Sequence, residues 1–355
     1  MDVKSELPEF RHNPSSGDWV IIATSRFKRP HFRIKRERRI VQPKKDCPFC
    51  PERIKEQLSP LACLSRKEGN SFNFSWSEKK KGKICPDWKI IALPNKFPAL
   101  MNKATKDRIK VKKKGVYQIV PGIGFHEVIV YRHHFKQLNQ FSQKDLEEAI
   151  SFWQQRFLVL EKEKNIRYIS FFTNFGQEAG ASLEHPHSQI IAAPIFDRDF
   201  ERSLKSSFEH QKKFGGCVHC QMIKSSLKEK KRILLENKDF VALIPFAPTM
   251  DFETRIYPKK HQNRFQDISS QEIISFASVL KKILEMIKKK LKNPSFNFFI
   301  RTSPVVVGSD DYSYYHWHLV ILPRVSIWGG FEFSAGMQII SIFPEQAASF
   351  LRGEK

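Results

Sequence analysis

The chain has 355 residues, with 61 Lys and Arg against 37 Asp and Glu, and its formal net charge is +24. A chain of this length can bury a sizeable core and accommodates two domains or one large one. Its first residues are charged and no apolar run is long enough to span a bilayer, so we expect a cytoplasmic protein rather than a secreted or membrane one.

The positive charge is concentrated in runs at 33–39, 79–83, 110–114 and 288–292. Such runs favour nucleic acid, an acidic membrane surface or phosphorylated small molecules, and they do not choose among these partners. No recognisable nucleic-acid-binding motif interleaves with them, so solvated surface lysines are the simpler interpretation. A zinc-stabilised nucleic-acid-binding protein is kept as the second functional hypothesis.

Two halves of the chain repeat the same order of features. The first half has a Cys-x-x-Cys pair, apolar strand-like runs at 90–95, 126–131 and 168–173, and a His-x-His before the apolar run 190–194. The second half has a Cys-x-x-Cys pair, strand-like runs at 240–245, 252–257 and 296–301, and a second His-x-His. His134 lies 51 residues before His185, and His261 lies 55 residues before His316, so we interpret the two halves as an internal repeat.

One helix is predicted in each half. Ser142 with Asp145, and Ser269 with Glu272, have the spacing of a capping box, and apolar residues follow both at helical intervals. The stretch 197–213, closed by two glycines, predicts a polar connecting helix. Short consecutive strands with one long helix per half indicate an α+β fold with antiparallel pairing, divided into residues 1–200 and 201–355. No dinucleotide-binding or P-loop glycine motif occurs in the sequence.

Each half supplies two cysteines and two histidines, the donor set of a structural Zn²⁺ site. We predict two zinc ions per chain, held by Cys47, Cys50, His134 and His185, and by Cys217, Cys220, His261 and His316. His133 and His219 are neighbouring alternatives that spacing does not exclude. A redox role for the cysteine pairs is the main rival, but neither pair has a thioredoxin-like βαβ context. Cys63 and Cys85 have no partner pattern, and we interpret them as structural.

The run at 184–194 (EHPHSQIIAAP) predicts a strand on which alternate side chains share a face. His185, His187 and Gln189 then point the same way, and Pro186 favours an edge strand open to substrate. With His185 on a metal, His187 is a fixed neutral imidazole that can attack phosphorus, and Gln189 can donate to a phosphate oxygen. Gly176, Gly180 and Ser182 form a small-residue loop suited to phosphate.

The second half lacks this extension. His316-Trp317-His318 is followed by Leu319-Val320, where the first half has Ser188-Gln189. His318 is therefore interpreted as a remnant without a catalytic role, and the sequence predicts one active site for each pair of repeats.

These motifs resemble the active-site signature of the galactose-1-phosphate uridylyltransferase family, a branch of the histidine-triad superfamily. The resemblance spans nearly the whole chain, through 11–14 (RHNP), 18–21 (DWVI), 26–30 (RFKRP), 95–100 (NKFPAL), 124–128 (GFHEV), 174–182 (NFGQEAGAS), 323–324 (PR), 330–332 (GFE) and 344–345 (PE). It implies duplicated histidine-triad-like halves, each an antiparallel sheet with a long helix, packed as one pseudo-symmetric unit.

The resemblance also implies a ping-pong reaction. His187 would attack the α-phosphorus of a nucleoside diphosphate sugar, release the sugar 1-phosphate and hold the nucleoside monophosphate as a phosphoramidate. Ser182 and Gln189 would hold phosphoryl oxygens. The other implied contacts are phosphate clamps by Arg26 and Arg29, a nucleotide site lined by Asn95 and Asn174, and sugar contacts by Glu332 and Gln338 across a homodimer interface.

The duplicated cysteine and histidine set is similar to the two-zinc members of this family, which include ADP-glucose phosphorylases. The chain departs from the family's sugar-side motif at 302–307 (TSPVVV). We therefore expect a UDP-glucose:hexose-1-phosphate uridylyltransferase of galactose metabolism, with adenylyl transfer from ADP-glucose to phosphate as the alternative. The sequence does not choose between uridine and adenine.

Overall fold

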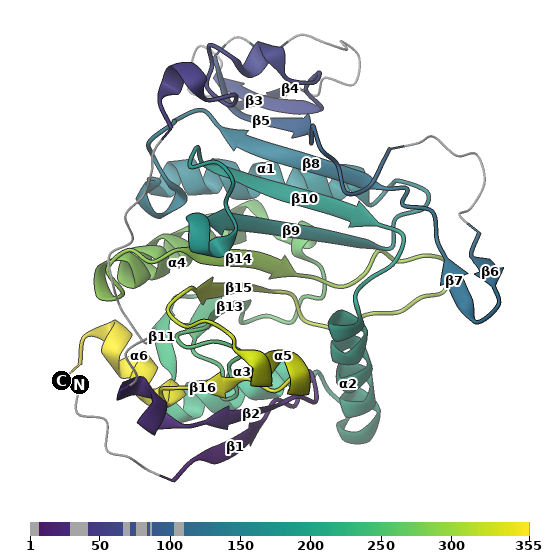
Figure 1. Cartoon of the computed structure of the whole chain (residues 1–355). Helices are drawn as coiled ribbons and strands as arrows, with labels where there is room; N and C mark the ends of the chain where they lie inside the picture. The colour runs from purple at the N-terminus through teal and green to yellow at the C-terminus, as the bar shows by residue number, and fades with distance from the viewer. Residues whose placement is uncertain are drawn as a thin grey trace.

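The computed structural model describes residues 7–28, 42–66, 72–75, 84–85, 87–102 and 110–354. Its main feature is an 11-stranded sheet in the order β11-β12-β13-β15-β14-β9-β10-β8-β5-β3-β4 (Figure 1). The strands are β3 (Ala62–Arg66), β4 (Phe72–Ser75), β5 (Trp88–Pro94), β8 (Phe125–Tyr131), β9 (Tyr168–Phe175), β10 (His187–Ala193), β11 (Ile233–Glu236), β12 (Phe240–Leu243), β13 (Thr254–Pro258), β14 (Phe296–Arg301) and β15 (His318–Pro323).

The order of the strands is itself a repeat. The series β3-β5-β8-β10-β9 of the first half is mirrored by β11-β12-β13-β15-β14 of the second, and the two series meet where β9 pairs with β14. All neighbouring strands of this sheet run antiparallel. The predicted α+β fold with two antiparallel halves in one pseudo-symmetric unit is therefore confirmed.

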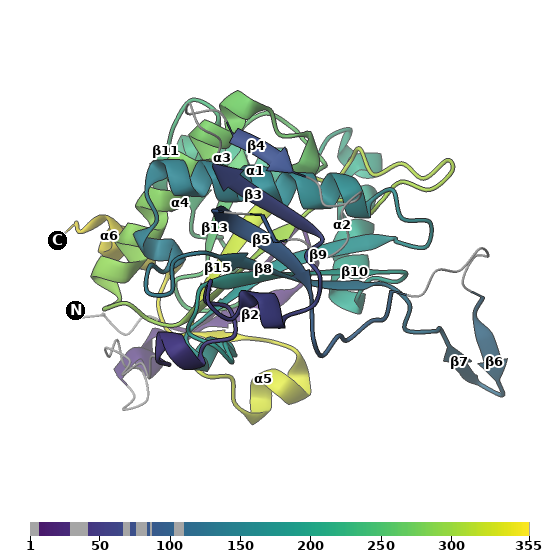
Figure 2. The same cartoon turned by 90° about the horizontal axis from the view of Figure 1, so that it is seen from above.

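The two predicted capped helices are present. Ser142 precedes α1 (Gln143–Leu160) and Ser269 precedes α4 (Ser270–Lys290), and each serine accepts from the backbone N–H three residues on, as the capping boxes predict. Both helices lie on one face of the sheet, opposite α5 (Gly330–Ala335) and β2 (Trp19–Ile22) (Figure 2). Their apolar faces share one core cluster with the central strands.

The two halves are joined by α2 (Arg198–Phe214), which is capped by Asp197 and ends at Gly215 with a φ of +72°, where glycine is favoured. A boundary near residue 200 stays a prediction, because the sheet continues across both halves. The remaining elements are α3 (Val218–Glu229), α6 (Pro344–Arg352), a small sheet of β1 (Glu9–His12), β2 and β16 (Ile339–Ile340), and the projecting hairpin β6 (Lys112–Lys114) with β7 (Tyr117–Ile119) (Figure 2).

One expectation from sequence differs from the structure, and one pairing was not predicted. The strand starts at His187 and lies between β8 and β9, so the predicted open edge is wrong. Pro186 sits immediately before β10, where a residue without an N–H removes no ladder hydrogen bond. Cys63 and Cys85, which showed no partner pattern, form a disulfide. Within the part of the chain that the structure describes, no helix is long and apolar enough to cross a membrane.

Successive side chains of β8 point to opposite faces of the sheet, so every second one faces the helices. Glu127, Ile129 and Tyr131 face α1, where Arg156 donates to Glu127 at 2.6 and 2.8 Å. Both members of this ion pair are buried. His126 and Val128 therefore point to the opposite face of the sheet, which is the face that carries His187 and Gln189.

The buried ion pair makes a stability prediction. Arg156→Met leaves the Glu127 carboxylate buried without its guanidinium, and we expect a loss of about 3 kcal/mol or more in the free energy of unfolding. The double variant Glu127→Leu/Arg156→Met removes both charges and should lose less than the single variant. Urea unfolding followed by circular dichroism measures both, and equal losses in the two variants would contradict the prediction.

Candidate active site and metal centres

The first cluster brings together the four predicted side chains of the first half. Cys47 and Cys50 come from the loop before β3, His134 follows β8, and His185 precedes β10. All four are buried, and their ligand atoms lie within 4.8 Å of one another. The Cys50 Sγ lies 3.1 Å from His134 Nδ1, and the two histidine Nδ1 atoms lie 3.2 Å apart.

The hydrogen bonds of these histidines fix their tautomers. His185 Nε2–H donates to the Tyr131 carbonyl at 2.7 Å, and His134 Nε2–H donates to the Gln42 carbonyl at 2.8 Å. Each neutral ring then keeps its lone pair on Nδ1, and these two lone pairs point at each other. A cation between them relieves the repulsion, and an imidazole oriented by a backbone carbonyl is the usual arrangement of a metal ligand. The donor set therefore fits a metal ion.

The second cluster repeats this arrangement in the second half. Its members are Cys217, Cys220, His261 and His316, again with ligand atoms within 4.8 Å of one another. His261 Nε2–H donates to the Ser313 carbonyl at 2.7 Å, and His316 Nε2–H donates to the Pro258 carbonyl at 3.0 Å. This cluster is more accessible than the first, since His261 is exposed and both cysteines are partly exposed.

The clusters favour one of the alternatives that spacing left open in each half, and the ligand assignment stays a prediction. His134 lies in the first cluster while His133 is exposed outside it. His219 is buried beside the second cluster but is not among its four members, and both of its ring nitrogens lack a hydrogen-bond partner.

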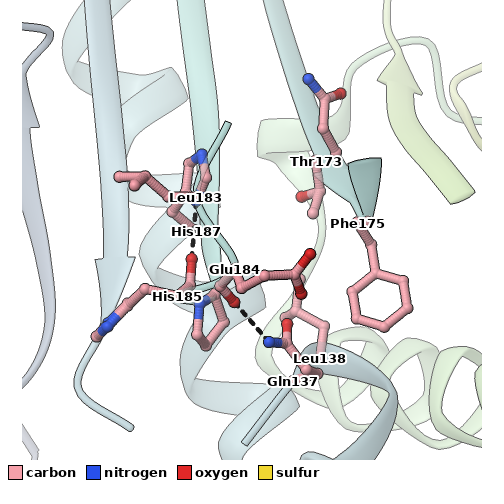
Figure 3. Close-up of a pocket in the computed structure, with 11 residues that line it drawn as sticks. Gln137, Leu138, Thr173, Phe175, Leu183, Glu184, His185 and His187 are labelled. Atoms are coloured by element: carbon pink, nitrogen blue, oxygen red, sulfur yellow. Dashed lines mark hydrogen bonds between the residues drawn. The ribbon is translucent and has the colours of Figure 1, made fainter. Parts of the chain in front are cut away.

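His187 is the first residue of β10, and Figure 3 shows it beside His185 of the first cluster. Its Nδ1–H donates to the carbonyl of His185 at 2.9 Å, so its lone pair is on Nε2. Burial lowers the pKa of His187 below the ordinary histidine value, which keeps the ring neutral. An uncharged imidazole in a fixed orientation is a competent nucleophile toward phosphorus.

A cavity of about 460 Å³ opens beside His187. Its polar lining includes Gln189, Ser182 and Asn95, so the structure brings these three predicted residues together with the predicted nucleophile. The apolar part of the cavity wall includes Phe49, Leu93 and Val128. A cavity with a mostly apolar wall and a few convergent polar groups is typical of a small-molecule site.

Asn174 lies at the end of β9 and lines a smaller hollow next to His187. Its side-chain oxygen accepts from the Asn297 amide at 2.8 Å. Figure 3 shows this hollow, with Thr173 and Phe175 of β9 facing Gln137 and Glu184. Asn174 therefore reaches the vicinity of His187 from the strand that joins the two halves.

Four predicted substrate residues line neither the cavity nor the smaller hollow. Arg26 lies in a short 3-10 helix, η1 (Thr24–Lys28), and Arg29 lies outside the described residues. Glu332 belongs to α5 and accepts from the Gly329 N–H, and Gln338 precedes β16. Figure 1 shows α5 and β16 beside β2, away from β10.

Sequence reasoning missed a role for His126. The residue appeared only as the start of the strand-like run 126–131 and inside the motif 124–128, and its partners come from the loop after β5 and from β10. His126 Nδ1 lies 3.0 Å from the Ala99 N, and His126 Nε2 lies 2.9 Å from the Gln189 Oε1. The only signal in the sequence is that His126 and Glu127 are adjacent in a strand and so point to opposite faces of the sheet. Once the strand register is known, His126 lies on the same face as Gln189.

Comparison with known proteins gives consistent matches. Residues 79–196 match the family described as galactose-1-phosphate uridyl transferase, N-terminal domain, and residues 226–327 match the HIT domain. The ADP-glucose phosphorylase of Arabidopsis thaliana is 30% identical over 99% of this chain and 94% of its own length. The galactose-1-phosphate uridylyltransferase of Thermotoga maritima is 27% identical over 98% of both chains.

The solved structures agree with the sequence comparisons. The crystal structure of an ADP-glucose phosphorylase from Arabidopsis thaliana with bound ADP-glucose has a TM-score of 0.79 and 29% identity, and the match covers 99% of each chain. The similarity therefore extends over both halves of the chain.

The difference in exposure between the clusters makes a prediction about metal release. In purified metal-loaded protein, we expect a chelator to remove the ion of the second cluster faster, because its ligands are reached from solvent. Released metal is followed with a colorimetric chelator. Cys217→Ser should abolish the fast phase, and Cys47→Ser should abolish the slow phase. A single phase that neither variant alters would contradict the prediction.

Proposed function

Because this chain belongs to the galactose-1-phosphate uridylyltransferase family, we propose that its nucleotidyl transfer proceeds through a covalent intermediate on His187. The observation that carries the proposal is the backbone hydrogen bond from His187 Nδ1, which leaves Nε2 as the nucleophilic atom beside the cavity. Nε2 attacks the α-phosphorus of a nucleoside diphosphate sugar, the bond to the bridging oxygen breaks, and the sugar 1-phosphate leaves. The acceptor then attacks the same phosphorus and regenerates the imidazole.

Gln189 and Ser182 stabilise the charge that builds on the phosphoryl oxygens in this proposal. Both line the cavity with His187, and each carries a side-chain donor. Donors already held in place need no reorganisation as the transition state forms, which makes them effective in a partly buried site. By analogy with the family, Asn95 and Asn174 bind the nucleotide. Arg26 and Arg29 bind its phosphates.

We propose that Zn²⁺ occupies both clusters. Two thiolates and two imidazoles form a closed tetrahedral set, which is typical of structural zinc. Such an ion holds its ligands rigidly and takes no part in the transfer. In the first cluster this rigidity fixes His185, and through its carbonyl the ring of His187.

Two donor and acceptor pairs are candidates. The first is UDP-glucose with a hexose 1-phosphate as acceptor, supported by the similarity to the uridylyltransferase of Thermotoga maritima. The second is ADP-glucose with phosphate as acceptor, favoured by the full-length similarity to the Arabidopsis ADP-glucose phosphorylase in sequence and structure. Both pairs use the same attack by His187, and they differ only in the base and the acceptor. A cytoplasmic location stays a prediction.

We also propose a homodimer in which Glu332 and Gln338 contact the sugar bound by the partner subunit. Within one chain, α5, which contains Glu332, and β16, which follows Gln338, lie beside β2 and away from β10 (Figure 1). The surface around α5 is rich in exposed apolar side chains, including Ile327, Phe331 and Phe333. Exposed apolar groups in one patch are typical of a surface that another protein covers.

The covalent intermediate is tested by intact-protein mass spectrometry after incubation with UDP-glucose and, separately, with ADP-glucose. We expect a uridylyl or adenylyl adduct that is absent in His187→Ala, because that variant lacks the nucleophile. The donor that gives the adduct identifies the base. An adduct of equal yield in His187→Ala would contradict the assignment, and no adduct from either donor in folded, metal-loaded protein would contradict the proposed donor class.

The shared site is tested by mixing two inactive variants. In a dimer of His187→Ala with Glu332→Gln, one of the two sites contains both wild-type residues only if Glu332 acts across the interface. After denaturation and co-refolding of equal amounts, we expect about a quarter of the wild-type activity to return, given random pairing into two-fold dimers. No recovery in a mixture that forms dimers by light scattering would place Glu332 outside the partner's site.

A further inference from the structure

We propose that His126 is a positioning residue that fixes which end of the Gln189 amide faces the reacting phosphate. The inference rests on the proposed transfer through His187. His126 and Gln189 share a face of adjacent antiparallel strands: Gln189 pairs with Val128 on β8, and Ile191 pairs with His126. The two side chains therefore meet diagonally across the strands, beside the cavity that His187 and Gln189 line.

A backbone amide sets the tautomer of His126. The Ala99 N–H donates to Nδ1 at 3.0 Å, and a backbone amide nitrogen can only donate, so Nδ1 carries the lone pair. The neutral ring therefore has its proton on Nε2. The doubly protonated ring is excluded in this arrangement, because two N–H groups would then face each other.

The tautomer in turn sets the orientation of Gln189. His126 Nε2–H donates to the Gln189 Oε1 at 2.9 Å. If the amide were reversed, its NH₂ group would face the N–H of His126 and the hydrogen bond would be lost. The carbonyl end of Gln189 therefore points to His126, and the NH₂ end is left to donate to a phosphoryl oxygen. The opposite orientation would direct a carbonyl oxygen at the negative phosphate and repel it.

Asn95 fits the same reasoning. Its Oδ1 accepts from the Phe97 N–H at 2.8 Å, so its NH₂ group lies at 3.1 Å from His126 Nε2. One neutral ring cannot accept from both the Ala99 N–H and the Asn95 NH₂, and the side-chain amide is the group that can turn away, so the Asn95 NH₂ is the donor left for a ligand. His126 thus joins the loop after β5, with Asn95 and Ala99, to the strand of the nucleophile.

Two variants separate the two hydrogen bonds of His126. Asn places its side-chain oxygen near the position of Nδ1, so His126→Asn can still accept from Ala99 but has no donor that reaches Gln189. Gln places its amide nitrogen near the position of Nε2, so His126→Gln can still donate to Gln189 but loses the acceptor for Ala99. A purely structural role in holding the loop predicts that His126→Gln is the damaged variant, and the positioning role predicts the opposite.

The measurement is the single-turnover rate at which the donor nucleotide transfers to His187, by rapid quench and mass spectrometry. We expect His126→Asn to slow this step by about ten- to a hundredfold, somewhat below the loss of a whole oxyanion donor, with little change in donor affinity. His126→Gln should retain most of the wild-type rate. In a Gln189→Leu background, His126→Asn should have no further effect, because the group that it positions is gone.

The outcomes separate this inference from the proposed function. A wild-type rate in His126→Asn, an equal loss in both variants, or an additive loss in the Gln189→Leu background would each overturn the positioning role while the covalent mechanism stands. Absence of any adduct in the wild-type protein would overturn the proposed function itself. Thermal unfolding of each variant checks that it folds. If His126→Asn does not fold, the rate of His126→Gln, measured with Gln189 and in the Gln189→Leu background, still decides between the structural and the positioning role.

Discussion

The chemistry of this molecule depends on imidazole rings whose protons are directed to backbone carbonyls. The Tyr131 carbonyl at the end of β8 accepts from His185 Nε2, and the His185 carbonyl accepts from His187 Nδ1. The first bond turns the His185 lone pair toward the cysteines, and the second turns the His187 lone pair toward the cavity. His185 and His187 therefore have opposite tautomers, and one is suited to metal binding and the other to nucleophilic attack.

The second half keeps the same backbone pattern, and aromatic rings pack against the histidine that corresponds to His187. His316 Nε2–H donates to the Pro258 carbonyl, and His318 Nδ1–H donates to the His316 carbonyl at 3.1 Å, as in the first half. Tyr257, four residues before His261 as Val130 is before His134, stacks on His318 with ring centroids 4.7 Å apart. The ring centroid of His219 lies 5.2 Å from that of His318. His187 and His318 are both buried, so one active site per repeat pair stays a prediction, supported by the cavity that His187 lines.

Local and repeated patterns were readable from the sequence, and contacts among distant segments were not. The capped helices after Ser142 and Ser269 follow from hydrogen bonds within three residues, and the two cysteine and histidine clusters follow from a donor set that occurs twice in the same order. The disulfide joins Cys63 on β3 to Cys85, 22 residues further along and before β5, and the contact of His126 with Gln189 depends on the register of β8 and β10. No local pattern encodes either contact. Pro186 misled because a proline just before a strand and one inside an edge strand look alike in sequence.

The central position of β10 changes how catalysis has to work. An edge strand could shift toward a substrate, but β10 is hydrogen-bonded to β8 and β9 on both sides and is tied by Ser188 to Tyr131 at 2.8 Å and to Thr173 at 2.7 Å. His187 is therefore held still, and the phosphorus must be brought to it by groups on the cavity wall. In such a site the rate depends on how accurately donor and phosphate are placed, since fixed groups need not be reorganised as the transition state forms. A network that fixes the orientation of one amide, such as Ala99 to His126 to Gln189, is then a direct contribution to catalysis.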